Sequence, residues 1–265
     1  MADDREILRE MWDGSLPVCF HLAREEVHGM QQPDPCYLLV PRQSYFPLVI
    51  DKVKKHFARF IQPDLQNEEL WLETSGIPLK LHYPIGVLFD LLAYDVVLPW
   101  NLTVRYQNFP DDESLKLSTD AAVESFFMST VKEANALKHR MQIMNDMQKK
   151  DYNQLWLGLL HYKFDQFWAI NRKLMDRSCD EFFKYIPFRI YQSDLSYTQK
   201  LFKPIGTSKE LHTLLDLIKT VIDLEETNRI IIQGIEVPSK TPIQWLSEHF
   251  SYPDNFLHIC IVPKT

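Results

Sequence analysis

The 265-residue sequence predicts an α+β fold in which two small mixed sheets flank a helix-rich segment. Short apolar runs with strand-like alternation dominate residues 15–109 and 183–265, whereas apolar residues recur at helical spacing in residues 110–182. The two strand-rich parts also repeat one order of elements: two strands, a helix, further strands, a short helix and a closing strand. One amphipathic helix on one face of such a sheet is the β-grasp arrangement, as in ubiquitin. The sequence therefore predicts two ubiquitin-like domains.

Residues 1–14 precede the first of these domains and are expected to form a short helix over residues 3–13. Acidic residues crowd its first turn, and Gly14 can terminate it. One face of this helix holds its apolar residues, which are Ile7, Leu8, Met11 and Trp12. Such spacing is typical of an amphipathic helix.

The first ubiquitin-like domain is predicted over residues 15–109. A hairpin is expected around Ser75 and Gly76, and Pro84 suits the first turn of a short helix. The expected strands are 16–22, 37–42, 69–74, 78–83 and 98–109, and the expected helices are 46–61 and 84–93.

The second ubiquitin-like domain is predicted over residues 183–265. Its last helix is expected to have Thr241 as N-cap and Pro242 at the first helical position. Gly234 interrupts one of its strands. The expected strands are 184–193, 197–206, 229–237 and 256–263, and the expected helices are 209–222 and 241–250.

A short internal echo supports the repeat of the two domains. The run P-I-G-V-L at residues 84–88 matches P-I-Q-W-L at residues 242–246. The run P-W-N-L at residues 99–102 matches P-D-N-F at residues 253–256. Both pairs fall near the short helix and the closing strand, where two copies of one fold should correspond.

The segment between these domains, residues 110–182, is predicted to hold two long helices, residues 118–151 and 153–175. Ser118 or Thr119 can cap the first helix. Its apolar stripe consists of Val123, Phe127, Thr130, Ala134, Leu137, Met141 and Met144. The second helix is rich in aromatic residues, which are expected to belong to the core and not to a cofactor site: Phe164, Phe167 and Trp168.

Composition excludes several classes of function. The net charge of −7 and the pI near 5.7 argue against a nucleic-acid partner. The acidic start lacks the features of a signal peptide, and the apolar stretch 84–100 is short and carries Asp90 and Asp95, so a cytoplasmic protein is expected. No cofactor and no metal are expected, because none of the cysteines has a partner at metal-ligand spacing: Cys19, Cys36, Cys179 and Cys260.

Lys132 is the residue whose surroundings raise a question of function. It follows Val123 by nine residues, which places it roughly 180° from the centre of the apolar stripe, facing solvent. The residues three and four positions away are not acidic, so no local ion pair occupies its amine. Lys138 also lacks an acidic neighbour at those spacings, so periodicity alone does not single out Lys132.

The whole set of segments resembles the autophagy protein 5 family, and the resemblance covers nearly the whole chain. Its most specific part is TPIQWLSEHFSYPDNFLHICIVP, residues 241–263. The other matching segments are YLLVPR (37–42), DKVKKHF (51–57), PLKLHYPIG (78–86), LPWN (98–101), FMSTVKEANALKH (127–139), MQKKD (147–151), FDQFWAINRKLM (164–175) and YIPFRIYQ (185–192). The departures lie in linkers such as 107–118 and 223–228.

The resemblance implies a non-catalytic role. Members of this family accept the ubiquitin-like autophagy protein 12 on one lysine, which falls on Lys132 here. The implied partners are autophagy protein 12, the N-terminal helix of the coiled-coil autophagy protein 16, and the conjugating enzymes autophagy proteins 10 and 3. The implied complex acts like a ligase in attaching autophagy protein 8 relatives to phosphatidylethanolamine. It is recruited from the cytoplasm to the phagophore membrane, and peripheral contact with that membrane comes through the complex.

The residues add one argument to this resemblance. A ubiquitin-like modifier ends in an exposed glycine tail, because its terminal carboxylate becomes a thioester and then an amide. This sequence ends in IVPKT and has no glycine after Gly234, so it is expected to accept a modifier and not to act as one.

Two alternatives come from other classes of function. One is a cysteine-dependent enzyme that uses Cys19, Cys36, Cys179 or Cys260, although no sequence pattern sets a histidine beside any of them; alkylation of the thiols would then abolish activity. The other is an adaptor that binds its partners and is never conjugated. An acceptor would give a conjugated, slower-migrating band on a gel that is lost in Lys132→Arg, whereas a pure adaptor would give no such band.

Overall fold

The computed structural model describes residues 4–66, 68–110, 115, 117, 119–139, 142–176, 181–192, 194–222 and 228–264. The chain divides into two compact units. One unit consists of residues 14–123, and the other joins residues 1–13 to residues 124–265.

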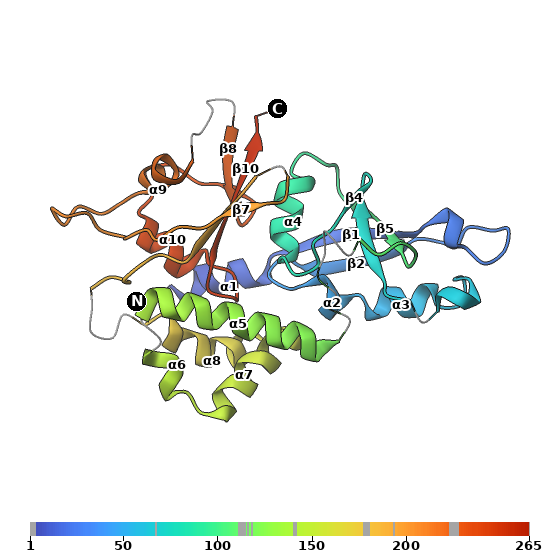
Figure 1. Cartoon of the computed structure of the whole chain (residues 1–265), viewed down its shortest axis with the longest axis horizontal. Coiled ribbons are helices and arrows are strands. Elements are labelled where there is room, and N and C mark those ends of the chain that lie inside the picture. The colour runs from blue at the N-terminus through green and yellow to red at the C-terminus, as the bar shows by residue number, and fades with distance from the viewer. Residues whose placement is uncertain are drawn as a thin grey trace. The chain divides into compact units, whose positions relative to one another are not determined.

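The unit of residues 14–123 contains a five-stranded mixed sheet in the order β2-β1-β5-β3-β4 (Figure 1). Strand β1 pairs antiparallel with β2 and parallel with β5, as a β-grasp sheet requires. The strands are β1 (Ser15–Leu22), β2 (Cys36–Pro41), β3 (Trp71–Thr74), β4 (Ile77–Pro78) and β5 (Trp100–Arg105). The helices of this unit are α2 (Phe46–Val49), α3 (Asp51–Phe57) and α4 (Ile85–Leu92), with 3-10 turns at Arg24–Glu26 and Pro63–Leu65.

Two elements of this unit differ from the prediction. The expected helix 46–61 is two helices, because the chain is interrupted at Ile50, where β-branched residues weaken the helix and Asp51 favours a new first turn. The expected strand 78–83 shrinks to β4, because the chain turns at residues 81–83, where the N–H of Tyr83 donates to the carbonyl oxygen of Lys80 at 2.8 Å. The turn before β4 places Ser75 and Gly76 at φ of 50° and 80°.

The second sheet, in the other unit, has the order β7-β6-β10-β8-β9, which repeats the first sheet strand for strand. Its two central strands, β6 and β10, run parallel. The strands are β6 (Phe188–Tyr191), β7 (Tyr197–Thr198), β8 (Asn228–Ile232), β9 (Ile235–Glu236) and β10 (Leu257–Pro263), and the helices are α9 (Leu214–Val221) and α10 (Ile243–His249). The prediction of two ubiquitin-like sheets is confirmed.

Three elements of the second domain differ from the prediction. Gly234 does not merely interrupt a strand but turns a hairpin, with Gln233 and Gly234 at φ of 55° and 77°. Helix α9 begins later than expected, because Thr213 and Asp216 form a capping box. The predicted strand 197–206 is reduced to the two residues of β7.

Only one of the two matching pairs of sequence runs occupies equivalent positions in the two domains. Pro84 and Pro242 are both N-caps, of α4 and α10, with similar dihedral angles of −56°, 143° and −60°, 130°. Pro242 is therefore not the first helical residue, and Thr241 is not the cap. Pro99 lies directly before β5, whereas Pro253 lies four residues before β10 begins at Leu257, so the second echo does not mark equivalent positions.

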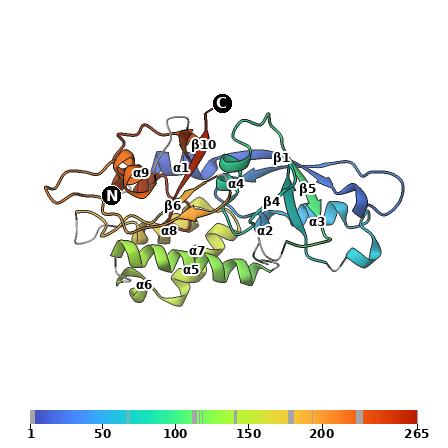
Figure 2. The same cartoon turned by 45° about the horizontal axis from the view of Figure 1, so that its top comes forward.

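Among its described residues, the helical part holds four helices where the sequence predicted two: α5 (Asp120–His139), α6 (Gln142–Asp146), α7 (Lys149–Leu160) and α8 (Phe164–Leu174). A capping box between Gln148 and Asp151 starts α7, and Tyr162, at φ of 52°, separates α7 from α8. Helix α5 begins after Thr119, whose hydroxyl accepts a hydrogen bond from the N–H of Ala122 at 3.2 Å. Helix α5 lies alongside α7 and α8 in both views (Figures 1 and 2).

The N-terminal helix α1 (Arg5–Asp13) packs on α8. The ring of Trp12 stacks on Tyr162 at 4.7 Å and lies 5.0 Å from the ring of Phe167. Phe164 and Phe167 are buried as expected, whereas Trp168 is half-buried. None of the described helices is long and apolar enough to cross a bilayer.

Candidate acceptor site on helix α5

Lys132 is exposed, at the middle of α5, as its helical angle predicted. The opposite face of the helix is buried, and the ring of Phe127 on that face lies 6.2 Å from the ring of Trp156 in α7. Buried residues of α5 include Val123, Phe127, Thr130, Val131 and Ala134. Leu137, expected on the same stripe, is only half-buried, and Met141 lies outside the described residues.

The surroundings of Lys132 leave its amine open. Ser129 and Ala136, one turn away on either side, are small and exposed, and Met128 is half-buried. Within the part of the chain that the structure describes, Lys132 makes no hydrogen bond or ion pair. The site therefore offers an accessible primary amine in the middle of a helix.

Lys138, six residues later, has a different environment, which the sequence did not predict. It is 2% exposed, and its Nζ lies 2.8 Å from Sδ of Met175 and 4.8 Å from the centre of the Phe183 ring. Burial lowers the pKa of Lys138 to about 7, although the carboxylates of Glu248 and Asp254 oppose this shift. A lysine with such a pKa is partly neutral near pH 7 and could act as a nucleophile. Its amine is buried, however, so a macromolecular reagent cannot reach it.

The C-terminal end of α5 is tied to the chain that enters the second sheet. The N–H groups of Lys184 and Tyr185 donate to the carbonyl oxygens of Lys138 and Leu137 at 3.1 and 3.2 Å. These bonds satisfy carbonyls that a helix end leaves without partners. His139 adds a hydrogen bond between its Nε2 and the carbonyl oxygen of Leu174 at 3.0 Å.

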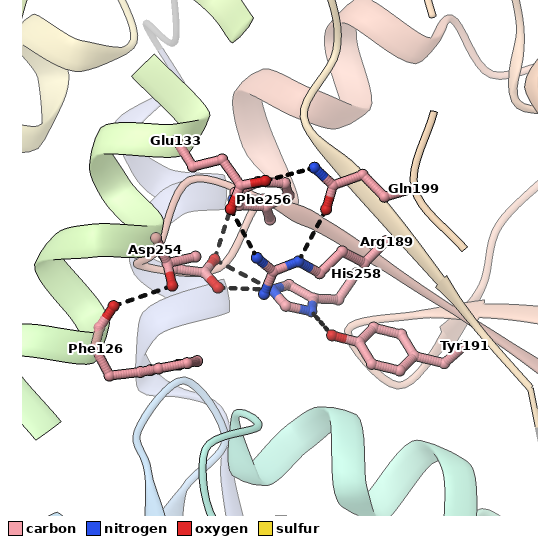
Figure 3. A network of polar contacts seen from close by, with 9 residues as sticks. Phe126, Glu133, Arg189, Tyr191, Gln199, Asp254, Phe256 and His258 are labelled. Atoms are coloured by element: carbon pink, nitrogen blue, oxygen red, sulfur yellow. Dashed lines mark hydrogen bonds and ion pairs between the residues drawn. The ribbon is translucent and has the colours of Figure 1, made fainter. Parts of the chain in front are cut away.

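Glu133, the residue after Lys132, joins α5 to the second sheet. Its Oε2 lies 3.2 Å from a guanidinium nitrogen of Arg189 on β6, and its Oε1 accepts a hydrogen bond from Nε2 of Gln199 at 2.6 Å (Figure 3). Arg189 lies over the rings of Phe256 and Tyr197, at 4.2 and 4.9 Å. Burial tends to lower the pKa of Arg189, but Asp254 and other neighbouring groups raise it overall, so the guanidinium remains a cation.

A buried chain of polar groups continues behind this pair. Nε2 of His258 lies 2.9 Å from Oδ2 of Asp254, and the hydroxyl of Tyr191 lies 2.8 Å from Nδ1 of the same ring (Figure 3). Burial tends to raise the pKa of Asp254, but the charges of His258 and Arg189 lower it overall. The side chains of Arg189, Asp254 and His258 therefore occupy the space on this face of the second sheet.

The first domain differs, because Tyr37 and Leu39 in its strand β2 are 65% and 72% exposed.

The described cysteines lie in strands of the two sheets. Cys19, Cys36 and Cys260 are buried free thiols, and Cys179 lies outside the described residues. No sequence pattern set a histidine beside any cysteine, but the structure places His21 beside Cys19. On one face of β1, Nε2 of His21 is 3.2 Å from its Sγ and also 3.2 Å from Oδ1 of Asn101. Because one ring nitrogen serves both contacts, it cannot accept a thiol proton while it donates to Asn101.

No metal-binding cluster of histidine, cysteine and carboxylate side chains occurs among the described residues. Helical spacing alone predicted neither the burial of Lys138 nor the Glu133–Arg189 pair. One signal for the pair was available. Arg189 interrupts the apolar strand FRIY, and a cation in a buried strand needs a paired anion.

The chain matches the models of three families. These are the UblA domain of autophagy protein ATG5 over residues 11–106, the ATG5 alpha-helical bundle region over residues 120–177 and the ATG5 UblB domain over residues 185–261. Autophagy protein 5 of Drosophila melanogaster is 48% identical to this chain, and the alignment covers 98% of both chains. Autophagy-related protein 5 of Caenorhabditis elegans is 32% identical over 98% of both chains. The crystal structure of Kluyveromyces marxianus Atg5 shares the fold, with a TM-score of 0.83 at 20% identity over 97% of this chain and 99% of that chain.

Proposed function

The chain belongs to the autophagy protein 5 family and has a role in autophagy, and we propose that in this role it accepts a ubiquitin-like protein, autophagy protein 12, on Lys132. The observation that carries the proposal is the contrast within one matching segment. Of its two lysines, Lys132 is exposed and unpaired among the described residues, whereas Lys138 is buried.

The proposed reaction needs only an accessible amine from this chain. The neutral Nζ of Lys132 attacks the carbonyl carbon of a thioester between the modifier and its conjugating enzyme, autophagy protein 10. A C–N bond forms, the C–S bond breaks and the thiolate leaves on the enzyme. The amine loses its proton to the enzyme or to solvent. Most lysine is protonated near pH 7, so the enzyme has to favour the neutral amine when it docks.

The conjugate then works as a component of a complex and not as a catalyst. It binds the N-terminal helix of autophagy protein 16 and, through autophagy protein 3, promotes the attachment of autophagy protein 8 relatives to phosphatidylethanolamine. The chain is cytoplasmic and reaches the phagophore membrane within this complex. This part of the proposal is supported by family membership alone.

Reconstitution with purified conjugating enzymes tests the acceptor. Wild-type chain is expected to give one conjugate whose branched peptide maps to Lys132, and Lys132→Arg is expected to give none, because arginine keeps the positive charge but offers no attacking amine. Lys149→Arg is the control, since Lys149 is exposed at the start of α7. Lys138→Arg is unsuitable, because that side chain is buried. A full conjugate in Lys132→Arg would show that another residue is the acceptor.

A further inference from the structure

Glu133 sits one residue after the proposed acceptor but points about 100° away from it around the helix. Its carboxylate is bound twice by the second ubiquitin-like domain, by Arg189 at 3.2 Å and by Gln199 at 2.6 Å. Figure 3 shows the three side chains turned toward one another, with Glu133 from α5 and its two partners from the second domain. The contact joins residues that are 56 and 66 positions apart in the chain.

The partner of Glu133 is held firmly. Arg189 is 6% exposed, and the rings of Phe256 and Tyr197 leave its guanidinium little freedom. Hydrogen bonds between ionised groups are short and directional, and a guanidinium binds a carboxylate in a fixed geometry. Because the side chain of Glu133 is 46% exposed, solvent weakens the attraction, and the pair contributes more to orientation than to stability.

The apolar contacts of α5 do not replace this restraint. The buried face of the helix packs against α7, through contacts such as Phe127 with Trp156, and its last turn is tied at Leu137 and Lys138. Glu133 follows Lys132 directly in the chain, and its carboxylate contacts the second domain. It therefore ties the turn that carries Lys132 to that domain.

We propose that Glu133 and Arg189 are positioning residues for conjugation at Lys132. They hold the middle of α5 on the second ubiquitin-like domain, so that a conjugating enzyme meets the amine and the surface of that domain in one fixed arrangement. This inference rests on the proposed function. Without the pair, the enzyme has to order the helix when it docks, and that ordering weakens binding.

The test uses Glu133→Gln in the full chain, because substitution of Arg189 would also remove a positive charge that lowers the pKa of the buried Asp254. Transfer from the conjugating enzyme charged with autophagy protein 12 is measured over a range of chain concentrations. The KM for the chain is expected to rise by about threefold or more, with kcat changed by less than about twofold, because ordering is a cost of docking. Gln199→Leu, which removes the second bond from the other side, should act in the same direction.

A second readout separates positioning from reactivity. The amine of Lys132 is acylated with a small water-soluble ester and quantified by peptide mapping. Glu133→Gln should be acylated like wild type, because Lys132 is exposed with or without the pair. Glu124→Gln, an equal loss of charge on α5, is the matched control and should match wild type in both assays.

The inference is overturned by an unchanged KM in Glu133→Gln, or by acylation with the small ester that falls in parallel with transfer. A kcat that falls alone also contradicts it. The proposed function fails in a different way, since wild-type chain would then give no conjugate on Lys132 before any variant is compared.

Discussion

Lys132 and Lys138 lie six residues apart on α5, yet the first is exposed and the second has its Nζ 2.8 Å from Sδ of Met175 in the interior. Six residues turn the helix by about 240°, so the two side chains leave it in different directions. One direction meets solvent. The other meets the junction between α8 and the second ubiquitin-like domain, which Phe183 lines.

The buried lysine should make stability depend on pH. Its pKa is about 7 in the folded protein, because of burial, and near 10.4 in an unfolded chain. Between these values the unfolded state binds more protons, so the contribution of Lys138 to the free energy of unfolding rises with pH and is least favourable below pH 7. Urea unfolding at several values from pH 6.5 to 9 should show a rise in wild type that is smaller in Lys138→Met. Parallel curves would contradict the assignment.

Conjugation and folding should be separable on α5. Lys132→Arg removes the proposed acceptor but should change the free energy of unfolding by less than about 0.5 kcal/mol, because lysine and arginine have similar helix propensity and the site is exposed. Phe127→Ala, on the fully buried face, should cost about 3–5 kcal/mol. Thermal melts without conjugation enzymes measure both. If Lys132→Arg melts as early as Phe127→Ala, a loss of conjugation in that variant says nothing about the acceptor.

The carboxylate of Asp254 should be needed for the second domain to stay folded. It is 2% exposed, lies 2.9 Å from Nε2 of His258, and accepts a hydrogen bond from the N–H of Phe256 at 3.0 Å. Asp254→Asn removes a charge that neighbouring cations depend on, so a loss of about 2–5 kcal/mol is expected. Asp176→Asn is the control, because Asp176 is exposed. The free energy of unfolding of both variants is measured by denaturant titration at neutral pH.

The same carboxylate predicts a loss of stability in acid. Because the pKa of Asp254 in the folded protein is below its ordinary value, its contribution is complete above about pH 4 and disappears as pH falls through the folded pKa. Wild type should therefore lose its advantage over Asp254→Asn as the pH of the melt is lowered from 5 to 3. An advantage that stays constant over this range would argue against an ionised Asp254.

Gly158 should tolerate no side chain. A Cβ there would lie 2.6 Å from the backbone nitrogen of Phe167, so α7 and α8 approach too closely to admit it. Gly158→Ala should destabilise the protein by about 1–3 kcal/mol, even though alanine is the better helix former. Gly206→Ala is the control, since the atoms nearest to its Cβ would be the end of the Glu210 side chain, which can move. Equal melting temperatures for the two variants would contradict the close approach.

The sequence by itself determined both ubiquitin-like domains and the exposure of Lys132. A strand repeats every two residues and a helix every 3.6, so the faces of β5 and α5 can be read from neighbouring residues alone. The repeat of element order then predicted two sheets with one topology, and both sheets have it.

Only the tertiary structure decided which polar side chains of α5 are buried. Lys132 lies about 180° from Val123 around the helix, whereas Lys138 lies about 60° from it, at the edge of the apolar stripe, where the helical angle alone does not decide burial. The difference comes from Met175 and Phe183, which cover one lysine and not the other, and from Arg189, which binds Glu133 across 56 residues. Helical periodicity records which face of a helix is apolar. It carries no information about distant segments that fold over its edges, and the burial of a charged group depends on the partners those segments supply.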